Sequence, residues 1–130
     1  MFAVLLSALS VLAAGPVTVP KLVLNTTASG QPILLPQGAV AVSTYLTTLA
    51  PGAVIPAHKH PWPRYAYVIS GKLKVTNLQT GTIQILQAGD FAVEARDQWH
   101  MGETLEGTEV QLYVIDQAPP GEANMIRKEP

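Results

Sequence analysis

Three histidines are the residues of this chain best suited to metal chemistry. His58 and His60 flank Lys59, and the only other histidine of the 130-residue sequence is His100. Side chains alternate between the two faces of a β-strand, so both imidazoles of the pair point the same way if the segment is extended. Imidazole nitrogen suits zinc, copper, iron and nickel, and three protein ligands with an open position are typical of a catalytic metal. We therefore predict one divalent transition metal, with iron, zinc, nickel or manganese as the candidates, held by all three histidines.

The three imidazoles converge only if two segments of the chain are neighbouring strands. The first segment, GAVIPAHKHPWPRYAYVISG, runs from Gly52 to Gly71, and the second begins at Gly89 and reaches His100. Short β-branched or alternating apolar runs separated by glycine and proline turns predict strands in both segments and around them. The predicted strands cover residues 40–49, 53–60, 65–70, 72–76, 82–86, 91–94 and 109–116. No stretch of residues 16–130 shows a convincing helical period, so we expect an all-β sandwich or barrel.

The ends of the chain lie outside this pattern. Residues 21–24 and 33–35 predict two short strands or arms, and residues 117–130, with three prolines and a glycine, predict a loosely packed tail. Residues 1–15, MFAVLLSALSVLAAG, are apolar and uncharged and end in small residues, as in a secretory signal peptide that lacks a basic start. Cleavage after Ala13 would make the protein periplasmic or secreted. A buried N-terminal segment, and a cytoplasmic protein, is the alternative.

The first segment resembles the first motif of the cupin family. That motif reads glycine, five residues, H-x-H, three or four residues, glutamate, six residues and glycine. The spacing from Gly52 through His58 and His60 to Gly71 follows it throughout, and only the glutamate is replaced, by Arg64. The resemblance makes residues 52–71 the first cupin motif.

The second segment, residues 89–104, resembles the second cupin motif more weakly. Gly89 and His100 match, whereas Ala95, Asp97 and Thr104 stand where the motif has proline, glycine and asparagine. The resemblance implies a single cupin domain over residues 16–116, folded as a double-stranded β-helix or jelly-roll barrel. It also implies homodimers, because family members commonly pair through sheet edges, and the apolar pieces of residues 17–35 would cover a partner's edge.

Arg64 is the main departure from the family pattern. A guanidinium stays charged and has no lone pair, so it cannot be a metal ligand. Three roles stay open for it: binding a substrate carboxylate beside a three-histidine metal, pairing with Glu94 or Glu103, or lying in solvent. Cupins with three histidines and no glutamate include thiol dioxygenases and a diketone-cleaving dioxygenase, so a metal is still expected. A neutral ligand set leaves the full charge of the ion and favours an anionic ligand.

Other side chains near the histidines are candidates for the remaining roles. Glu94 is the best replacement carboxylate, although a surface charge at a strand end is its ordinary role, and Glu94 and Tyr65 are the candidate general bases. Aromatic side chains cluster in sequence around the histidines and either wall a pocket or fill the barrel. With Arg64, three of them are the predicted substrate-binding residues: Trp62, Tyr67 and Trp99.

Composition narrows the class of partner. Hydrophobic residues make up 48% of the chain and charged residues 13%, which predicts a folded domain. The net charge of −1 and the lack of a basic stripe exclude a nucleic-acid partner, and no membrane contact is expected after signal cleavage. There is no cysteine, so disulfides and thiolate ligands are excluded. We expect a metal-dependent enzyme, dioxygenase-like, acting on a small anionic or enolisable molecule. The alternatives are a non-catalytic module for a metal or small ligand, or a scaffold barrel with a vestigial site.

Overall fold

The structure, a computed structural model, describes residues 13–130 and contains only strands and connecting loops. The expected all-β architecture is confirmed. In chain order the strands are β1 (Ala41–Leu49), β2 (Val54–Lys59), β3 (Arg64–Ser70), β4 (Lys72–Asn77), β5 (Ile83–Gln87), β6 (Phe91–Val93), β7 (His100–Thr104), β8 (Val110–Ala118) and β9 (Ile126–Arg127). Over the described residues there is no apolar helix of the length that a membrane crossing needs.

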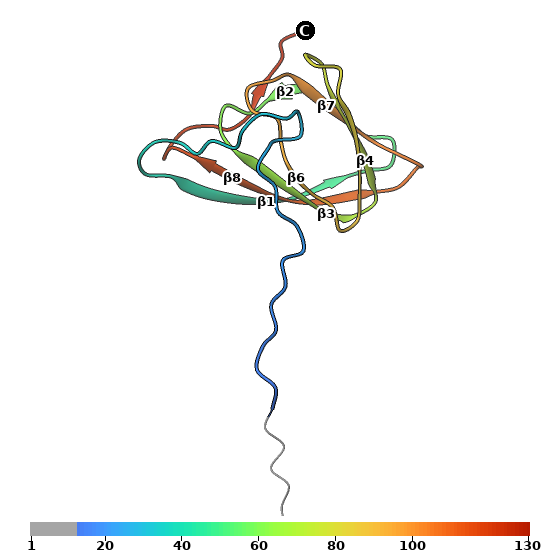
Figure 1. Ribbon diagram of the computed structural model, residues 1–130. Coiled ribbons are helices and arrows are strands. Elements are labelled where there is room, and N and C mark those ends of the chain that lie inside the picture. The colour runs from blue at the N-terminus through green and yellow to red at the C-terminus, as the bar shows by residue number, and fades with distance from the viewer. Residues whose placement is uncertain (1–12) are drawn as a thin grey trace, which may run out of the picture.

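The strands form two antiparallel sheets that face each other (Figure 1). One sheet has the order β1-β8-β3-β6 and the other the order β5-β4-β7-β2-β9. Apart from the consecutive strands β4 and β5, neighbours in each sheet are distant in sequence, because the chain crosses between the sheets as it goes. This is the predicted jelly-roll arrangement, and it makes β2 and β7, which carry histidines, direct neighbours.

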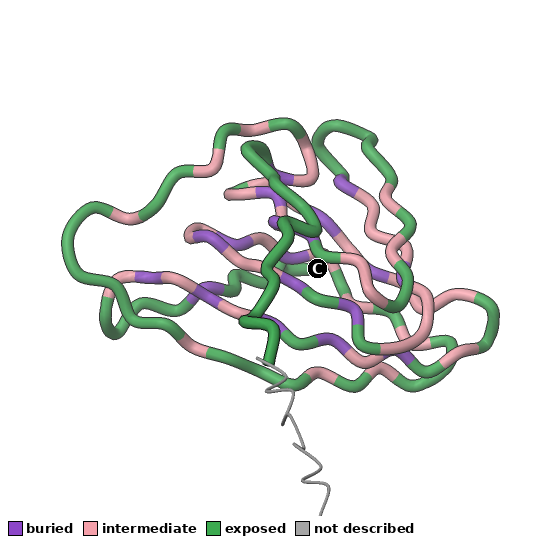
Figure 2. Tube along the Cα trace, turned by 60° about the horizontal axis from the view of Figure 1, so that its bottom comes forward, coloured by how far each residue is buried: buried purple, intermediate pink, exposed green. Residues whose placement is uncertain are grey.

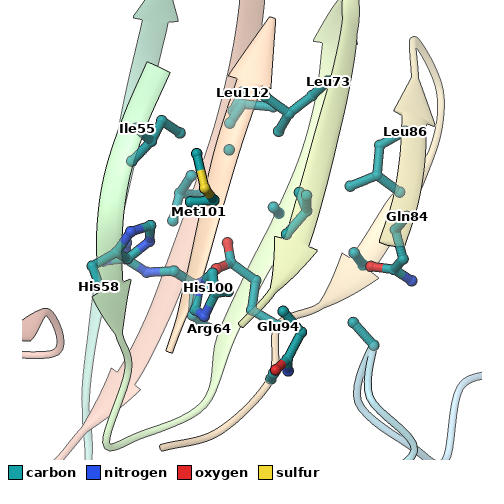
Figure 3. A pocket seen from close by; sticks show the side chains of 18 of the residues that line it. Ile55, His58, Arg64, Leu73, Gln84, Leu86, Glu94, His100, Met101 and Leu112 are labelled. Carbon is teal, nitrogen blue, oxygen red and sulfur yellow. The ribbon is translucent and has the colours of Figure 1, made fainter. Parts of the chain in front are cut away.

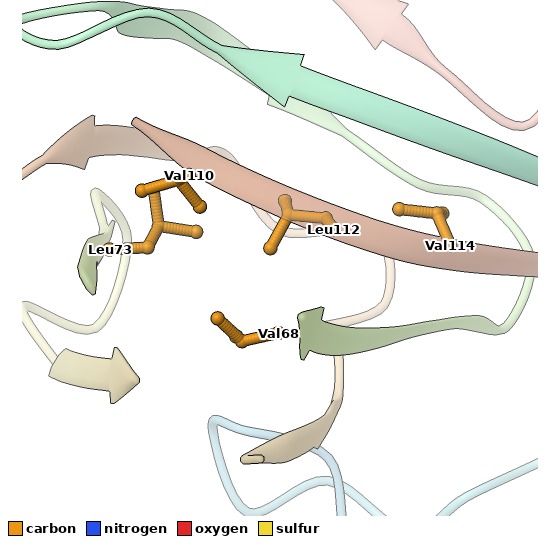
Figure 4. Packing of buried hydrophobic residues seen from close by; sticks show 5 residues of the cluster. All are labelled: Val68, Leu73, Val110, Leu112 and Val114. Atoms are coloured by element: carbon orange, nitrogen blue, oxygen red, sulfur yellow. The ribbon is translucent and has the colours of Figure 1, made fainter. Parts of the chain in front are cut away.

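The hydrophobic core lies between the sheets, where every second residue of a strand points inward. Along β8 the side chains of Val110, Leu112 and Val114 are buried, and they pack against Val68 of β3 and Leu73 of β4 (Figure 4). Buried positions recur along the strands, whereas the connecting loops are mostly exposed (Figure 2). The alternation follows from the pleat, which leaves one face of each sheet for the core.

Both ends of the chain differ from their predictions. Residues 13–24 are exposed, with residues 13–20 extending away from the barrel (Figure 1), and the strands expected at 21–24 and 33–35 do not form. Instead, Thr26 and Pro32 make an isolated bridge that closes a turn. The C-terminal segment is not loose, since β9 pairs with β2 and Asn124 is buried. Most of the predicted signal peptide, residues 1–12, lies outside the described part of the chain.

The β3–β4 turn depends on Gly71, which has a φ of 81°. A Cβ at this position would collide with the carbonyl oxygen of Glu109 and press on Val110. Both the left-handed backbone and this collision oppose a side chain. We expect Gly71→Ala to lower the free energy of unfolding by about 3 kcal/mol, measured by urea denaturation.

Gly81 provides the matched control for Gly71. Its φ is 75°, and nothing lies within 4 Å of a Cβ built there. Gly81→Ala therefore keeps only the conformational penalty, about 1 kcal/mol. Equal losses in the two variants would contradict the role given to the Glu109 contact.

Candidate metal centre

The three histidines meet inside the barrel as predicted. His58 lies directly opposite His100 in the β2–β7 pair, and His60 follows at the end of β2 with the same orientation. The ring centroids are 4.4 Å apart for His58 and His100, 4.9 Å for His58 and His60, and 5.0 Å for His60 and His100. All three residues are buried. Lys59 points the other way and forms an ion pair with Asp97.

A β-bulge in β2 sets the direction of His58. The β2–β7 register shifts between Ile55 and His58, which lets both residues face the cavity although three positions separate them. An extra residue in one strand re-aims the side chains that follow it. The bulge thus brings an apolar wall and a metal-ligand candidate onto the same face of one strand.

Each imidazole is oriented by a hydrogen bond to the backbone carbonyl of a different residue. The Nδ1 atoms lie 2.7 Å from the carbonyl oxygen of Pro56 for His58, 2.6 Å from that of Asn124 for His60, and 2.8 Å from that of Gln98 for His100. Donation from Nδ1 fixes the tautomer and leaves the Nε2 lone pairs for the centre of the cluster. This outer layer of hydrogen bonds is what histidine metal ligands ordinarily have.

Glu94 completes the cluster from the opposite sheet. It follows β6, and its backbone NH donates to the carbonyl of Arg64, so its side chain points into the barrel. One carboxylate oxygen lies 3.0 Å from Nε2 of His60 and 3.2 Å from Nε2 of His100. The four candidate ligand atoms, including one from His58, all lie within 4.8 Å of one another. Sequence reasoning had held Glu94 only as a replacement carboxylate, and the structure places it where such a ligand belongs.

Burial and the charges within the cluster shift the pKa values of His58, Glu94 and His100 in opposite directions. Burial lowers the pKa of His58 to about 4, so this imidazole is neutral at physiological pH. Burial alone would lower the pKa of His100 and raise that of Glu94, but the hydrogen bond and the attraction between the two outweigh it. The pKa of His100 is therefore raised, and that of Glu94 lies well below its usual range.

The buried Nε2 of His60 makes no hydrogen bond of acceptable geometry within the described part of the chain, although a Glu94 carboxylate oxygen lies 3.0 Å from it. Because Nδ1 is the donor, Nε2 has a lone pair that faces this carboxylate oxygen. Buried nitrogens of this kind are nearly always paired, so an unpaired one calls for an explanation. A metal ion at the centre would bind this lone pair together with the other two imidazoles and the carboxylate. The residues present therefore form a His-His-Glu-His group able to hold a metal ion.

Arg64 faces the barrel interior but pairs with neither of the two predicted partners. It lies opposite Asp116 in the β3–β8 register, and two of its nitrogens donate to the two carboxylate oxygens at 2.7 Å each. The predicted pairing with Glu94 or Glu103 and the solvent-exposed alternative are wrong, since the Arg64 side chain is only 11% exposed. On the other side of β3, Glu94 lies next to Arg64, so Arg64 lies between two acidic residues of the neighbouring segments.

The C-terminal segment ties this ion pair to the histidines. The Asn124 side chain donates to Asp116 at 2.8 Å and accepts from the backbone NH of Trp62, also at 2.8 Å. Its carbonyl is the oxygen that orients His60. Sequence reasoning missed both Asp116 and Asn124. The alternation along β8 points Asp116 inward and was a usable signal, whereas nothing local marks Asn124 as buried.

A cavity of about 180 Å³ opens beside the cluster, between the two sheets (Figure 3). His58, Arg64, Glu94 and His100 lie at one end of it, and apolar side chains form much of the rest. Small-molecule sites are typically concave and mostly apolar, with a few convergent polar groups. The geometry therefore suits a small ligand that reaches the histidines with one end.

The aromatic residues predicted to wall this cavity lie elsewhere. None of Trp62, Tyr65, Tyr67 and Trp99 is among its lining residues. The Tyr65 hydroxyl donates to Gln117 at 2.7 Å, and its ring stacks on Phe91. Arg96 lies over the ring of Trp62, and Lys59 lies over that of Trp99. Tyr65 and Tyr67 alternate along β3 with the inward-facing Arg64 and Ala66, whereas Trp62 and Trp99 lie in loops.

Comparison with known proteins agrees with this geometry. The family model described as Cupin domain matches residues 45–116. This chain belongs to the cupin family. Among curated protein sequences no match is found.

Solved structures similar to this cupin include proteins of very different length. An uncharacterized conserved protein with a double-stranded β-helix domain from Klebsiella pneumoniae is 30% identical, with a TM-score of 0.52 over 68% of this chain and 76% of that one. An oxalate oxidase is 26% identical, with a TM-score of 0.56 over 66% of this chain and 45% of that one. The DMSP lyase DddQ from Ruegeria pomeroyi is 16% identical, with a TM-score of 0.58 over 66% and 42%, and shows likeness of fold alone. This cupin spans less than half the length of the two enzymes.

Proposed function

We propose that this cupin binds one divalent transition metal through His58, His60, His100 and Glu94, and that it is an enzyme acting on a small anionic or enolisable molecule. The observation that carries the proposal is the convergence of three oriented Nε2 atoms and one carboxylate at one end of a cavity between the two sheets. A bound ion would polarise an oxygen of the ligand and, as ferrous iron, would also support dioxygenase-like chemistry.

The residues of the chain have distinct parts in such a reaction. The enclosing sheets keep bulk water from the ligand, which strengthens every electrostatic contact inside. Glu94 is the one acidic side chain among the described residues that line the cavity, so it is the group able to take a proton from a bound ligand. Tyr65, the other candidate base, is turned away and bonded to Gln117.

Similar structures support a small carboxylate as the ligand. One oxalate oxidase structure, 24% identical to this cupin, contains the substrate analogue glycolate, and an oxalate decarboxylase structure, 20% identical, contains formate. We infer that glycolate and related small carboxylates are suitable first probes. Oxygen consumption by the iron-loaded protein with these probes tests the catalytic part of the proposal.

A non-catalytic module that holds a metal or a small ligand is the second candidate. It is favoured by the position of Glu94 within the ligand cluster, because a carboxylate bound to the ion is no longer a free base. Metal binding without turnover of any probe would select this function over the enzyme.

Glu94→Gln tests the ligand set directly. The amide keeps the shape of the side chain but removes the anionic oxygen, so we expect metal affinity to fall by about 10- to 100-fold. Competition against a chelator measures the change. Glu103→Gln is the matched control, because Glu103 pairs with Lys74 away from the cluster. Equal affinity in wild type and Glu94→Gln would remove Glu94 from the proposed ligand set.

The homodimer and the exported location stay proposals. In support of a dimer, the outer face of the β1-β8-β3-β6 sheet carries a row of partly exposed apolar side chains across all four strands. The row consists of Leu46, Tyr113, Tyr67 and Phe91. Apolar surface of this kind is a common feature of protein interfaces.

A further inference from the structure

We propose that the ligand of this cavity is a monoanion with one carboxylate and an apolar body, rather than a dicarboxylate. The inference rests on the proposed metal site, which would bind the carboxylate. It goes further by assigning the chemistry of the other end of the ligand. Two features carry it: the separation of charged and apolar residues along the cavity, and the number of charges that surround the metal site.

The charged and apolar residues of the cavity lie at different ends (Figure 3). Glu94 and Arg64 supply the charges of one end, where they lie beside His58 and His100. Away from them the wall is mainly aliphatic, with a few uncharged polar side chains. The aliphatic side chains come from strands of both sheets: Ile55, Leu73, Leu86, Met101 and Leu112. A ligand whose carboxylate lies at the histidines therefore has its body against aliphatic side chains.

The charges around the metal site leave room for one negative charge. With a divalent ion, the carboxylates of Glu94 and Asp116 and the guanidinium of Arg64 leave a net charge of plus one, since metal-bound imidazoles are neutral. A monocarboxylate neutralises this charge. A second carboxylate would leave excess negative charge in a buried site, which is strongly unfavourable.

Among the described residues that line the cavity, no free cation is available to hold a second carboxylate. Uncharged polar side chains, such as Gln84 and Thr82, also line the cavity, but apart from the histidines Arg64 is the one cationic side chain among its described lining residues. Arg64 already makes two hydrogen bonds to Asp116. A distal carboxylate would therefore face aliphatic and uncharged polar groups without a counter-charge.

The test compares two acids of equal chain length. The zinc-loaded protein, chosen because zinc has no redox chemistry, is titrated with pentanoate and with glutarate in a calorimeter. We expect pentanoate to bind at least tenfold more tightly than glutarate, because glutarate places a charge against the apolar wall. Metal content is measured separately on the same samples.

Two variants of β5 locate the apolar end. Leu86 points into the cavity, whereas its neighbour Ile85 points outward and is 52% exposed. Leu86→Asn places an amide against the ligand body and should weaken pentanoate binding by about tenfold with unchanged zinc content. Ile85→Asn makes the same chemical change on the outer face and should leave pentanoate binding unchanged.

Each outcome decides between distinct conclusions. Glutarate binding as tightly as pentanoate, or no binding of pentanoate to a protein that holds zinc, overturns the inference and leaves the metal site standing. A protein that takes up no zinc overturns the proposed function itself. Pentanoate binding that is equal in wild type and Leu86→Asn shows that the ligand body lies elsewhere.

Discussion

His60→Ala should empty the metal site. The substitution removes one of three oriented nitrogens, and it is the nitrogen that makes no hydrogen bond in the described structure and faces a Glu94 carboxylate oxygen at 3.0 Å. It also frees the Asn124 carbonyl, which His60 Nδ1 approaches to 2.6 Å. We expect metal content to fall from about one ion per chain to near zero, measured by elemental analysis of protein purified without an affinity tag.

Lys59→Ala is the control for His60→Ala, because Lys59 lies on the same strand and points to the other face. It should keep the metal content of the wild type. Circular dichroism checks that both variants are folded. Should folded His60→Ala protein hold as much metal as the wild type, the histidines would not be the ligands.

Arg64→Glu should make the metal-free protein much less stable. The motif spacing alone predicts a gain, because glutamate is the residue that the family pattern has at this position and it would attract the ion. In the structure, however, Arg64 lies between Asp116 and Glu94, and Asp116 is only 5% exposed. Glutamate would bring three carboxylates together without a cation. Breaking a buried pair in this way costs about 4 kcal/mol, and urea denaturation of the metal-free protein measures the loss.

Metal should restore more stability to Arg64→Glu than to the wild type. The ion would offset the extra negative charge, and the variant carboxylate would lie near the ligand cluster. The double variant Arg64→Glu, Asp116→Asn is the control, since it removes one of the three charges while keeping the side-chain volumes. It should recover part of the lost stability. Unchanged stability in Arg64→Glu would mean that the Arg64–Asp116 pair contributes nothing measurable to folding.

The sequence by itself determined the fold class and the three histidines. Strand alternation is a local property, so it placed His58 and His60 on one face and Lys59 on the other, as the structure confirms. Glycine and proline turns likewise marked most strand boundaries. Pairing between the two motif segments followed from the family spacing, and it appears as the direct His58–His100 register.

Only the tertiary structure decided what surrounds the histidines. Arg64 was known to be a departure, but its partner Asp116 lies 52 positions later in the chain and is found through the β3–β8 register. Asn124 reaches His60 because the C-terminal segment folds back along β2, in a stretch whose composition predicted a loose tail. The aromatic residues near the histidines in sequence lie outside the cavity, which their sequence positions alone did not reveal. Contacts between sheets depend on register, bulges and chain crossings, which are set by the packing of the whole barrel and leave no local pattern in the residues concerned.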